Sequence, residues 1–202
     1  TSLIIGFLAA SISSIVGLFI GINAGYFKGN IDKTITIMID LFLTFPTFFL
    51  LLALVSYIQA SALILIIVIS VTGWMGMARM IRSESFAIGN KPFIKILKVA
   101  NVSTFKIIFK YFAPLLAPIF LISFTFGVGG SILAESGLSF LGLGVNPPSM
   151  SWGSLLSDGK AVIDIAWWVS FFPGFMIFLI TFCLIQISDY LQTLANSKEI
   201  VS

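Results

Sequence analysis

Long apolar runs constrain this chain more than any other feature of its sequence. A helix needs about 20 apolar residues to cross the hydrocarbon core of a bilayer. Five runs fit this requirement: Leu3–Ala24, Thr34–Ser56, Ser61–Ala78, Pro114–Ala134 and Ile165–Ser188. Only Tyr57–Ala60 separates the second run from the third, which predicts a tight turn there. The sequence therefore predicts an all-α, polytopic membrane protein with five transmembrane helices, organised as a single transmembrane domain over residues 1–202.

Composition excludes several function classes. Charged residues make up 9% of the chain, whereas soluble domains carry about 25%, so a soluble enzyme is excluded. The net charge of +3 is small and scattered, and we expect no nucleic-acid partner. The chain has no His and a single cysteine, Cys183. Histidine metal ligands and histidine acid–base catalysis are therefore excluded, and we expect no metal site.

The positions of the basic residues predict the orientation. If the five runs alternate, ten of the eleven Lys and Arg residues lie on one side of the membrane, and only Lys160 lies on the other. The positive-inside rule assigns the basic side to the cytoplasm. The C-terminus, with Lys198, is then cytoplasmic and Thr1 lies outside, which predicts one further span upstream of Thr1.

A polar connector of about residues 79–113 follows the third run. It contains two amphipathic pieces, Pro92–Ala100 and Thr104–Phe112, with Pro92 in a first turn where its missing N–H is harmless and Ser103 as a candidate N-cap. Lys91, Lys95 and Lys98 share one helix face. Two interpretations stay open: a basic helix on anionic headgroups, or a docking helix that inserts its apolar side into a cytoplasmic partner.

A glycine-rich outer loop of about residues 135–164 follows the fourth run. Pro147 and Pro148 forbid regular helix there. Glu135, at the end of the run, has to face protein or water, because a carboxylate facing lipid costs a few kcal/mol. The segment is either an outer gate or substrate passage, or a plain loop with an interfacial Glu135. Asp40 and Asp189, near the inner ends of their runs, are either interfacial carboxylates or polar ties between helices or subunits.

The string LAESGLSFLGLGVNPPSMSWGSLL closely resembles a stretch of the inner-membrane permease subunits of peptide and nickel ATP-binding-cassette importers. It looks like the C-type subunit of the dipeptide/oligopeptide permease pair. Further strings resemble the same family in order and spacing: NAGYFKGNIDK, MIDLFLTFPTFFLLLAL, GWMGMARMIRSE and PGFMIFLITFCLIQISDYL. The resemblance covers nearly the whole chain. It implies the fold of a type I importer permease, in the cytoplasmic membrane of a bacterium or archaeon.

The resemblance implies a coupling helix in the connector after the third span, with a family pattern near E-A-A-x-x-x-G-x(9)-I-x-L-P. Here Lys95-Ile96-Leu97 stand at E-A-A, Asn101 stands at the Gly and Phe112-Ala113-Pro114 stand at the end. Asn suits the glycine position because it tolerates the left-handed conformation. Ile96 and Leu97 replace small residues, which predicts an enlarged apolar contact. The implied coupling residues are Lys91, Phe93, Ile94, Lys95, Ile96, Leu97, Lys98, Ala100 and Asn101.

The resemblance also assigns the outer loop to a gate. The implied gate or passage residues are Glu135, Ser139, Gly142, Gly144, Pro147, Pro148, Trp152 and Gly153, with Asp40 and Asp189 as inner-side polar ties.

The partners that the resemblance implies are a homologous second permease subunit, two cytoplasmic ATPase subunits, an extracytoplasmic solute-binding protein and the lipid membrane. The chain would form half of a peptide pore that works by alternating access. It lacks the phosphate-binding pattern G-x-x-x-x-G-K-[ST], so we expect no enzyme activity and no cofactor in this chain, with ATP and Mg bound by the ATPase subunits. Alternatives are a nickel or metal-chelate importer of the same family, an ATP-independent secondary transporter or channel, and a membrane scaffold.

Overall fold

The structure is a computed structural model that describes residues 1–58, 61–145 and 147–200, with side chains as far as Leu194. Tyr57–Ala60, where we expect a tight turn, lies partly outside this range. The described elements are α1 (Ser2–Phe27), α2 (Gly29–Thr44), α3 (Thr47–Ser56), α4 (Ala62–Asn90), α5 (Pro92–Val99), α6 (Thr104–Ile107), a π-helical turn η1 (Ile108–Phe112), α7 (Ala113–Phe140), α8 (Trp152–Lys160) and α9 (Trp168–Ile200). All are helical, which confirms the predicted fold class.

The long helices match the predicted spans. Four of the described helices are long and apolar enough to cross a membrane, and there are five spans if the bent pair α2 and α3 counts as one. The spans extend beyond the apolar runs, since α4 continues through Arg79 to Asn90 and α7 continues through Glu135 to Phe140. About a third of the predicted polar connector, Arg79–Asn90, therefore belongs to α4, the helix that contains the third apolar run.

The second predicted span, Thr34–Ser56, is not one straight helix. It divides into α2 and α3, which bend by 79° at Phe45–Pro46. Proline has no N–H to continue the helical ladder, and it disfavours helical backbone in the residue before it. Phe45 accordingly adopts an extended conformation with ψ 135°. The prediction of a single regular span is wrong at this point.

A stripe of glycines brings α1 into backbone contact with α4. Gly17, Gly21 and Gly25 recur at every fourth residue and therefore share one face of α1. A Cβ atom added at these positions would lie 2.8, 2.7 and 2.7 Å from the carbonyl oxygens of Trp74, Ala78 and Arg82, which are also four residues apart. Only glycine permits this approach, so the stripe fixes the register of the two helices.

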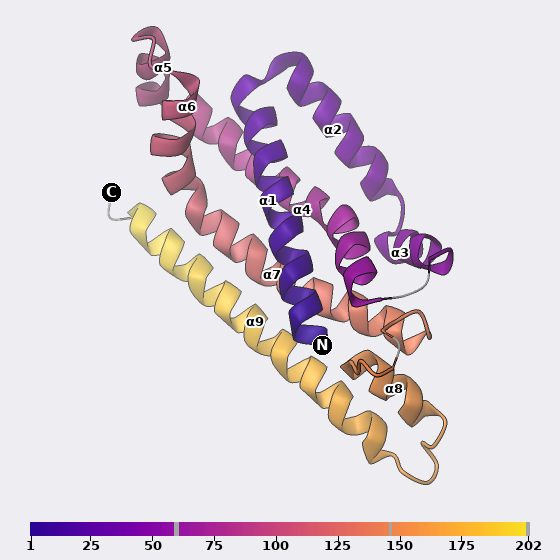
Figure 1. Ribbon diagram of the computed structural model, residues 1–202. Helices are drawn as coiled ribbons and strands as arrows, with labels where there is room; N and C mark the ends of the chain where they lie inside the picture. Colours follow the sequence, from indigo (N-terminus) through magenta and orange to yellow (C-terminus); the bar gives the residue numbers. More distant parts are fainter. Residues whose placement is uncertain (59–60, 146, 201–202) are drawn as a thin grey trace.

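Two apolar clusters close the opposite ends of the bundle. In Figure 1, α5 and α6 lie at one end, which we call the connector end, and α8 lies at the other, which we call the loop end. The connector-end cluster consists of Ile22, Tyr26, Met77, Ile81, Ile88, Ile94, Ile107, Phe112 and Leu116. The loop-end cluster consists of Ile5, Ala9, Leu51, Val55, Leu65, Val68, Ile69, Leu138 and Val145. Helix α9 runs along the outside, next to α7 and α8 (Figure 1).

The glycine stripe generates a stability prediction. Gly21→Ala places a methyl group against the Ala78 carbonyl, and such overpacking costs about 1–3 kcal/mol. Gly130→Ala is the matched control, because nothing lies within 4 Å of an added Cβ there and Ala is favoured over Gly inside a helix by about 0.5–1 kcal/mol. We expect a lower thermal unfolding midpoint in detergent for Gly21→Ala alone. Equal midpoints would contradict the close approach of α1 and α4.

Candidate functional site

Helix α5, the predicted coupling helix, is anchored on the connector end through one side. Pro92 occupies its first turn, as predicted. Ile94 is fully buried in the connector-end cluster, and Leu97 packs against the same cluster. Lys98 also turns toward the body, with its ammonium group 4.1 Å from the centre of the Tyr26 ring on α1. The inner side of α5 is therefore bound to α1, α4 and the segment that leads into α7.

Asn101 ends α5 in the conformation that its position demands. Its φ is 53°, in the left-handed region. The Asn101 N–H donates to the Lys98 carbonyl, and the Val102 N–H donates to the Leu97 carbonyl, both at 3.1 Å. These two bonds form the Schellman motif that closes many helices, usually with glycine at this position. Asn101 therefore adopts the left-handed conformation that asparagine is expected to tolerate at this position, and its correspondence to a family glycine stays a prediction.

The outer side of α5 is apolar and exposed. Ile96 and Val99 are 66% and 83% exposed, and Phe93 beside them is 39% exposed. Lys91, Lys95 and Ala100 are exposed as well. Ile96 and Leu97 therefore point to different sides, and the prediction that both enlarge one outward contact is wrong for Leu97. The exposed ridge consists of Phe93, Ile96 and Val99.

The second amphipathic piece does not form a separate helix. Thr104–Ile107 continues through η1 directly into α7. Ser103 holds the N-cap position, but its side chain makes no capping hydrogen bond, so that predicted contact is wrong. Ile107 and Phe112 are buried in the connector-end cluster beside Ile94. The connector therefore folds back onto the base of α7 and packs as part of the body.

Most of the predicted gate residues surround one pocket at the loop end. The pocket has a volume of about 250 Å³ and is lined by Ser139, Gly142, Gly144, Val145, Pro147, Pro148, Ser149, Met150, Ser154, Ser157 and Asp158. These residues come from the end of α7, the following loop and α8. Gly142, with φ 81°, lets the chain leave α7. Part of the sequence string that carries the family resemblance thus lines one pocket.

Glu135 lies fully buried behind this pocket. Ser139, one turn further along α7, donates a hydrogen bond of 2.6 Å to Glu135 Oε1. Ser136 donates a longer bond of 3.5 Å to Glu135 Oε2. Because Ser139 also lines the pocket, its hydroxyl connects the buried carboxyl group to the pocket wall. Glu135 faces protein, as the cost of a carboxylate in lipid requires.

Trp152 and Gly153 attach α8 to the bundle. The Trp152 N–H donates to the Ser2 hydroxyl at 2.9 Å, and Trp152 lines a second cavity of about 180 Å³ beside α1. A Cβ at Gly153 would lie 2.5 Å from the Ser136 carbonyl oxygen. These contacts place α8 against α1 and α7 at once, so the gate pocket has a rigid floor.

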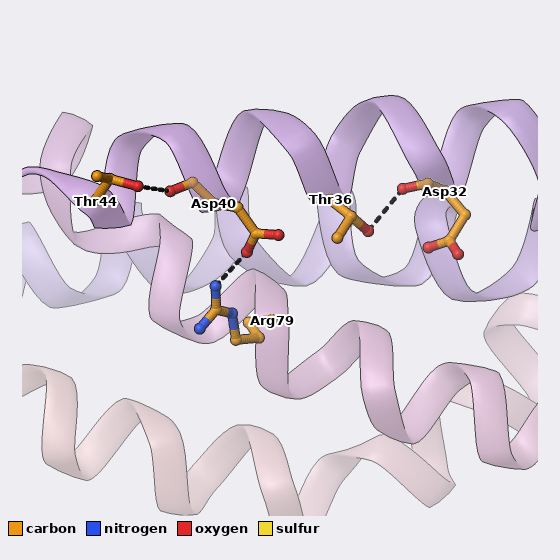
Figure 2. Close-up of polar contacts among 5 residues, drawn as sticks. All are labelled: Asp32, Thr36, Asp40, Thr44 and Arg79. Carbon is orange, nitrogen blue, oxygen red and sulfur yellow. Dashed lines mark hydrogen bonds and ion pairs between the residues drawn. The ribbon is translucent and has the colours of Figure 1, made fainter.

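Asp40 is tied to α4, and Figure 2 shows the contact. The carboxylate of Asp40 on α2 forms an ion pair with Arg79 on α4. Asp32, which lies on the same helix nearer the connector end, accepts two hydrogen bonds from the Arg82 guanidinium group, at 2.5 and 2.9 Å. Sequence reasoning selected Asp40 alone. The recurrence of Asp32 and Asp40 eight residues apart, opposite two arginines three residues apart, is the signal that could have revealed both pairs.

Asp189, the other predicted tie, lies exposed on α9. It forms no ion pair with the side chains described up to Leu194, so its role stays a prediction. Within the described part of the chain, no three His, Cys, Asp or Glu side chains lie together as a protein metal site requires. Lys198 lies beyond the described side chains.

The arrangement of the described spans matches that of a solved transporter chain. The structure aligns with a chain from the MetNI methionine ABC transporter, solved in inward-facing conformations, with a TM-score of 0.71 and 16% identity, over 94% of this chain and 92% of that chain. At this identity, the similarity establishes the fold.

The chain belongs to the binding-protein-dependent transport system inner membrane component family, whose model matches residues 17–198. It is 34% identical to the oligopeptide transport system permease protein OppC of Haemophilus influenzae, over 98% of this chain and 64% of that protein. It is also 34% identical to the dipeptide transport system permease protein DppC of Bacillus subtilis, over 98% of this chain and 62% of that protein. The chain thus spans somewhat less than two thirds of these relatives. The predicted family is confirmed, and the protein is a multi-pass membrane protein.

The hydrogen bond behind the gate pocket generates a second prediction. Ser139→Ala leaves one oxygen of the buried Glu135 carboxyl group without its short donor, which costs about 1–3 kcal/mol. Ser157→Ala, at the α8 wall of the same pocket, is the matched control. We expect a lower thermal unfolding midpoint for Ser139→Ala only. If both variants have the same unfolding midpoint as the parent protein, the Ser139–Glu135 hydrogen bond does not contribute to stability.

Proposed function

We propose that this chain is a permease subunit of an ATP-binding-cassette importer for peptides and forms half of its translocation pore. Family membership and the names of the relatives, oligopeptide and dipeptide transport system permease proteins, support this function. A homologous permease supplies the other half of the pore. Two ATPase subunits hydrolyse ATP, and a solute-binding protein delivers the peptide.

The observation that carries the proposal is the geometry of α5. Its inner side is bound to the body through Ile94 and Leu97, and its outer side presents an exposed ridge of Phe93, Ile96 and Val99. A helix that lays its apolar face into a groove is a common recognition mode. The ATPase subunit occupies this ridge, with Lys91 and Lys95 at its rim. The connector end then faces the cytoplasm, in agreement with the positive-inside rule.

The loop end, on the opposite face, forms part of the outer gate. Beside its pocket, Gly144 and Gly153 lie so close to Ser139 and Ser136 of α7 that neither position has room for an added side chain. ATP binding closes the ATPase pair and displaces α5, and the spans then rotate between inward-open and outward-open arrangements. Glu135 stays buried in protein throughout, because exposure to lipid is costly.

Co-purification tests the proposed function directly. The full-length protein is extracted in mild detergent, and the associated chains are identified by mass spectrometry. We expect a second permease and an ATPase, and peptide uptake into vesicles that depends on ATP. A known importer extracted in parallel is the control for complex stability. Recovery of the chain alone, while the control complex survives, would overturn the proposal in favour of an ATP-independent transporter or a scaffold.

The two sides of α5 generate a third prediction. Ile96→Asp places a charge in the exposed ridge, where it removes an apolar contact with the ATPase without disturbing the body. We expect uptake and ATPase co-purification to fall at least about tenfold, the loss that corresponds to 1.4 kcal/mol, with an unchanged unfolding midpoint. Ile165→Asp, at a position near α8 that is 83% exposed, is the matched control and should keep its activity.

Leu97→Asp separates packing from docking. Leu97 packs against the connector-end cluster, so this variant should lose stability as well as uptake. Normal uptake by Ile96→Asp would exclude the ridge as the docking surface.

A further inference from the structure

Helix α2 is exposed on two opposite flanks of contrasting chemistry. It buries only one side chain fully, that of Ile39. On one flank, Asp32, Thr36, Asp40 and Thr44 recur at every fourth residue (Figure 2). Met38 and Phe42 lie two residues before and after Asp40, about 200° around the helix axis, and are 46% and 44% exposed. The apolar flank suits lipid, and the polar flank requires a different environment.

The ion pair on the polar flank is open to its surroundings. The side chains of Asp40 and Arg79 are 57% and 54% exposed, although α4 has the length and composition of a membrane span, and so does the bent pair of α2 and α3 taken together. Charged groups near the inner end of a span face protein or water, because contact with hydrocarbon is costly. The neighbouring pair of Asp32 and Arg82 is much more enclosed, with 16% and 29% exposure. Only the Asp40–Arg79 pair is thus presented outward.

Helix α4 extends the polar surface. Gly76 and Ser83 lie three residues before and four residues after Arg79, so they share its face. Both are exposed, and a Cβ at Gly76 would meet nothing within 4 Å. The hydroxyl groups of Thr36 and Thr44 already donate to the carbonyls of Asp32 and Asp40, at 2.8 Å each. Because their protons are already donated, these threonines present hydroxyl oxygens to the surface as hydrogen-bond acceptors.

We propose that this polar face, consisting of Thr36, Asp40 and Thr44 of α2 with Gly76, Arg79 and Ser83 of α4, lines the water-filled part of the translocation path. The inference rests on the proposed function, because it assumes that a path runs beside this chain. The Asp40–Arg79 ion pair carries no net charge, so it neither repels nor attracts one end of a zwitterionic peptide over the other. A wall of this kind passes peptides of varied net charge, whereas a lone carboxylate or guanidinium would select one sign.

Two other environments would account for the exposure in the isolated chain. The face could be a dry seam against the second permease subunit, or it could be covered by another segment of the full-length protein. Both would exclude water from Thr44 and Ser83 in the assembled complex. Water access in that complex therefore decides between the path and these alternatives.

The experiment measures thiol reactivity in the assembled complex, held in lipid nanodiscs so that both membrane faces are open. Cys183, the exposed cysteine on α9, is first changed to Ser. Single cysteines are then introduced as Thr44→Cys and Ser83→Cys on the polar face, and as Phe42→Cys on the apolar flank. Phe42 is the matched control, because it lies within one turn of Thr44 on the same helix. A negatively charged, membrane-impermeant thiosulfonate is the probe, and nucleotide is absent.

We expect Thr44→Cys and Ser83→Cys to react at least about tenfold faster than Phe42→Cys, because a thiol buried away from water has a raised pKa and each pKa unit removes tenfold of its thiolate. Equal rates at all three positions, or no reaction at the polar positions, would overturn the inference. The same preparation is assayed for ATP-dependent uptake in vesicles. Absence of uptake and of an ATPase counts against the proposed function. Slow labelling of Thr44→Cys and Ser83→Cys in an active complex counts only against the proposal that the polar face lines the water-filled path.

Discussion

The backbone contact between α1 and α4 determines where the other helices of this bundle lie. Because Gly17, Gly21 and Gly25 carry no side chains, the carbonyls of Trp74, Ala78 and Arg82 approach α1 more closely than any larger residue would allow. Apolar side chains gain little by leaving lipid for a protein interior, so close packing of small residues drives association of spans. Once α4 is fixed in this register, Arg79 and Arg82 point toward α2, and Ile81 and Ile88 form the seat on which α5 rests.

This arrangement connects the two ends of the molecule through rigid elements. Ile94 of α5 shares one cluster with Ile88 of α4 and with Phe112 at the base of α7. A displacement of α5 is therefore passed to two long helices simultaneously, because packed interiors transmit strain instead of absorbing it. Helix α7 carries Glu135 at its far end, where Ser139 ties it to the gate pocket. The proposed inner coupling site and outer gate thus lie at opposite ends of α7, which runs as one helix from Ala113 to Phe140 with Pro118 inside it.

Sequence reasoning found the features that depend on local chemistry. The length of the apolar runs predicts the spans, and Pro92 predicts the start of α5. The tolerance of Asn for left-handed backbone agrees with the turn at Asn101. It failed where the answer depends on a helix's rotation or on a distant partner. Ile96 and Leu97 are adjacent and equally apolar, and only the docked orientation of α5 separates the exposed residue from the packed one. The break at Pro46 was overlooked because proline is tolerated inside membrane helices when neighbouring groups satisfy the freed backbone.

The proposed role of the polar flank accounts for the weak packing of α2. A helix that borders water on one side and lipid on the other has only a narrow strip left for burial against its own subunit, and here that strip holds Ile39. The ion pairs to Arg79 and Arg82 supply the attachment that apolar burial cannot. Exposed ion pairs are weak and are screened by salt, so α2 is held less firmly than α1 or α4. The sharp bend into α3 compensates for this weak attachment of α2. Helix α3 buries Leu51 and Val55 in the loop-end cluster and so anchors the other end of the α2–α3 segment.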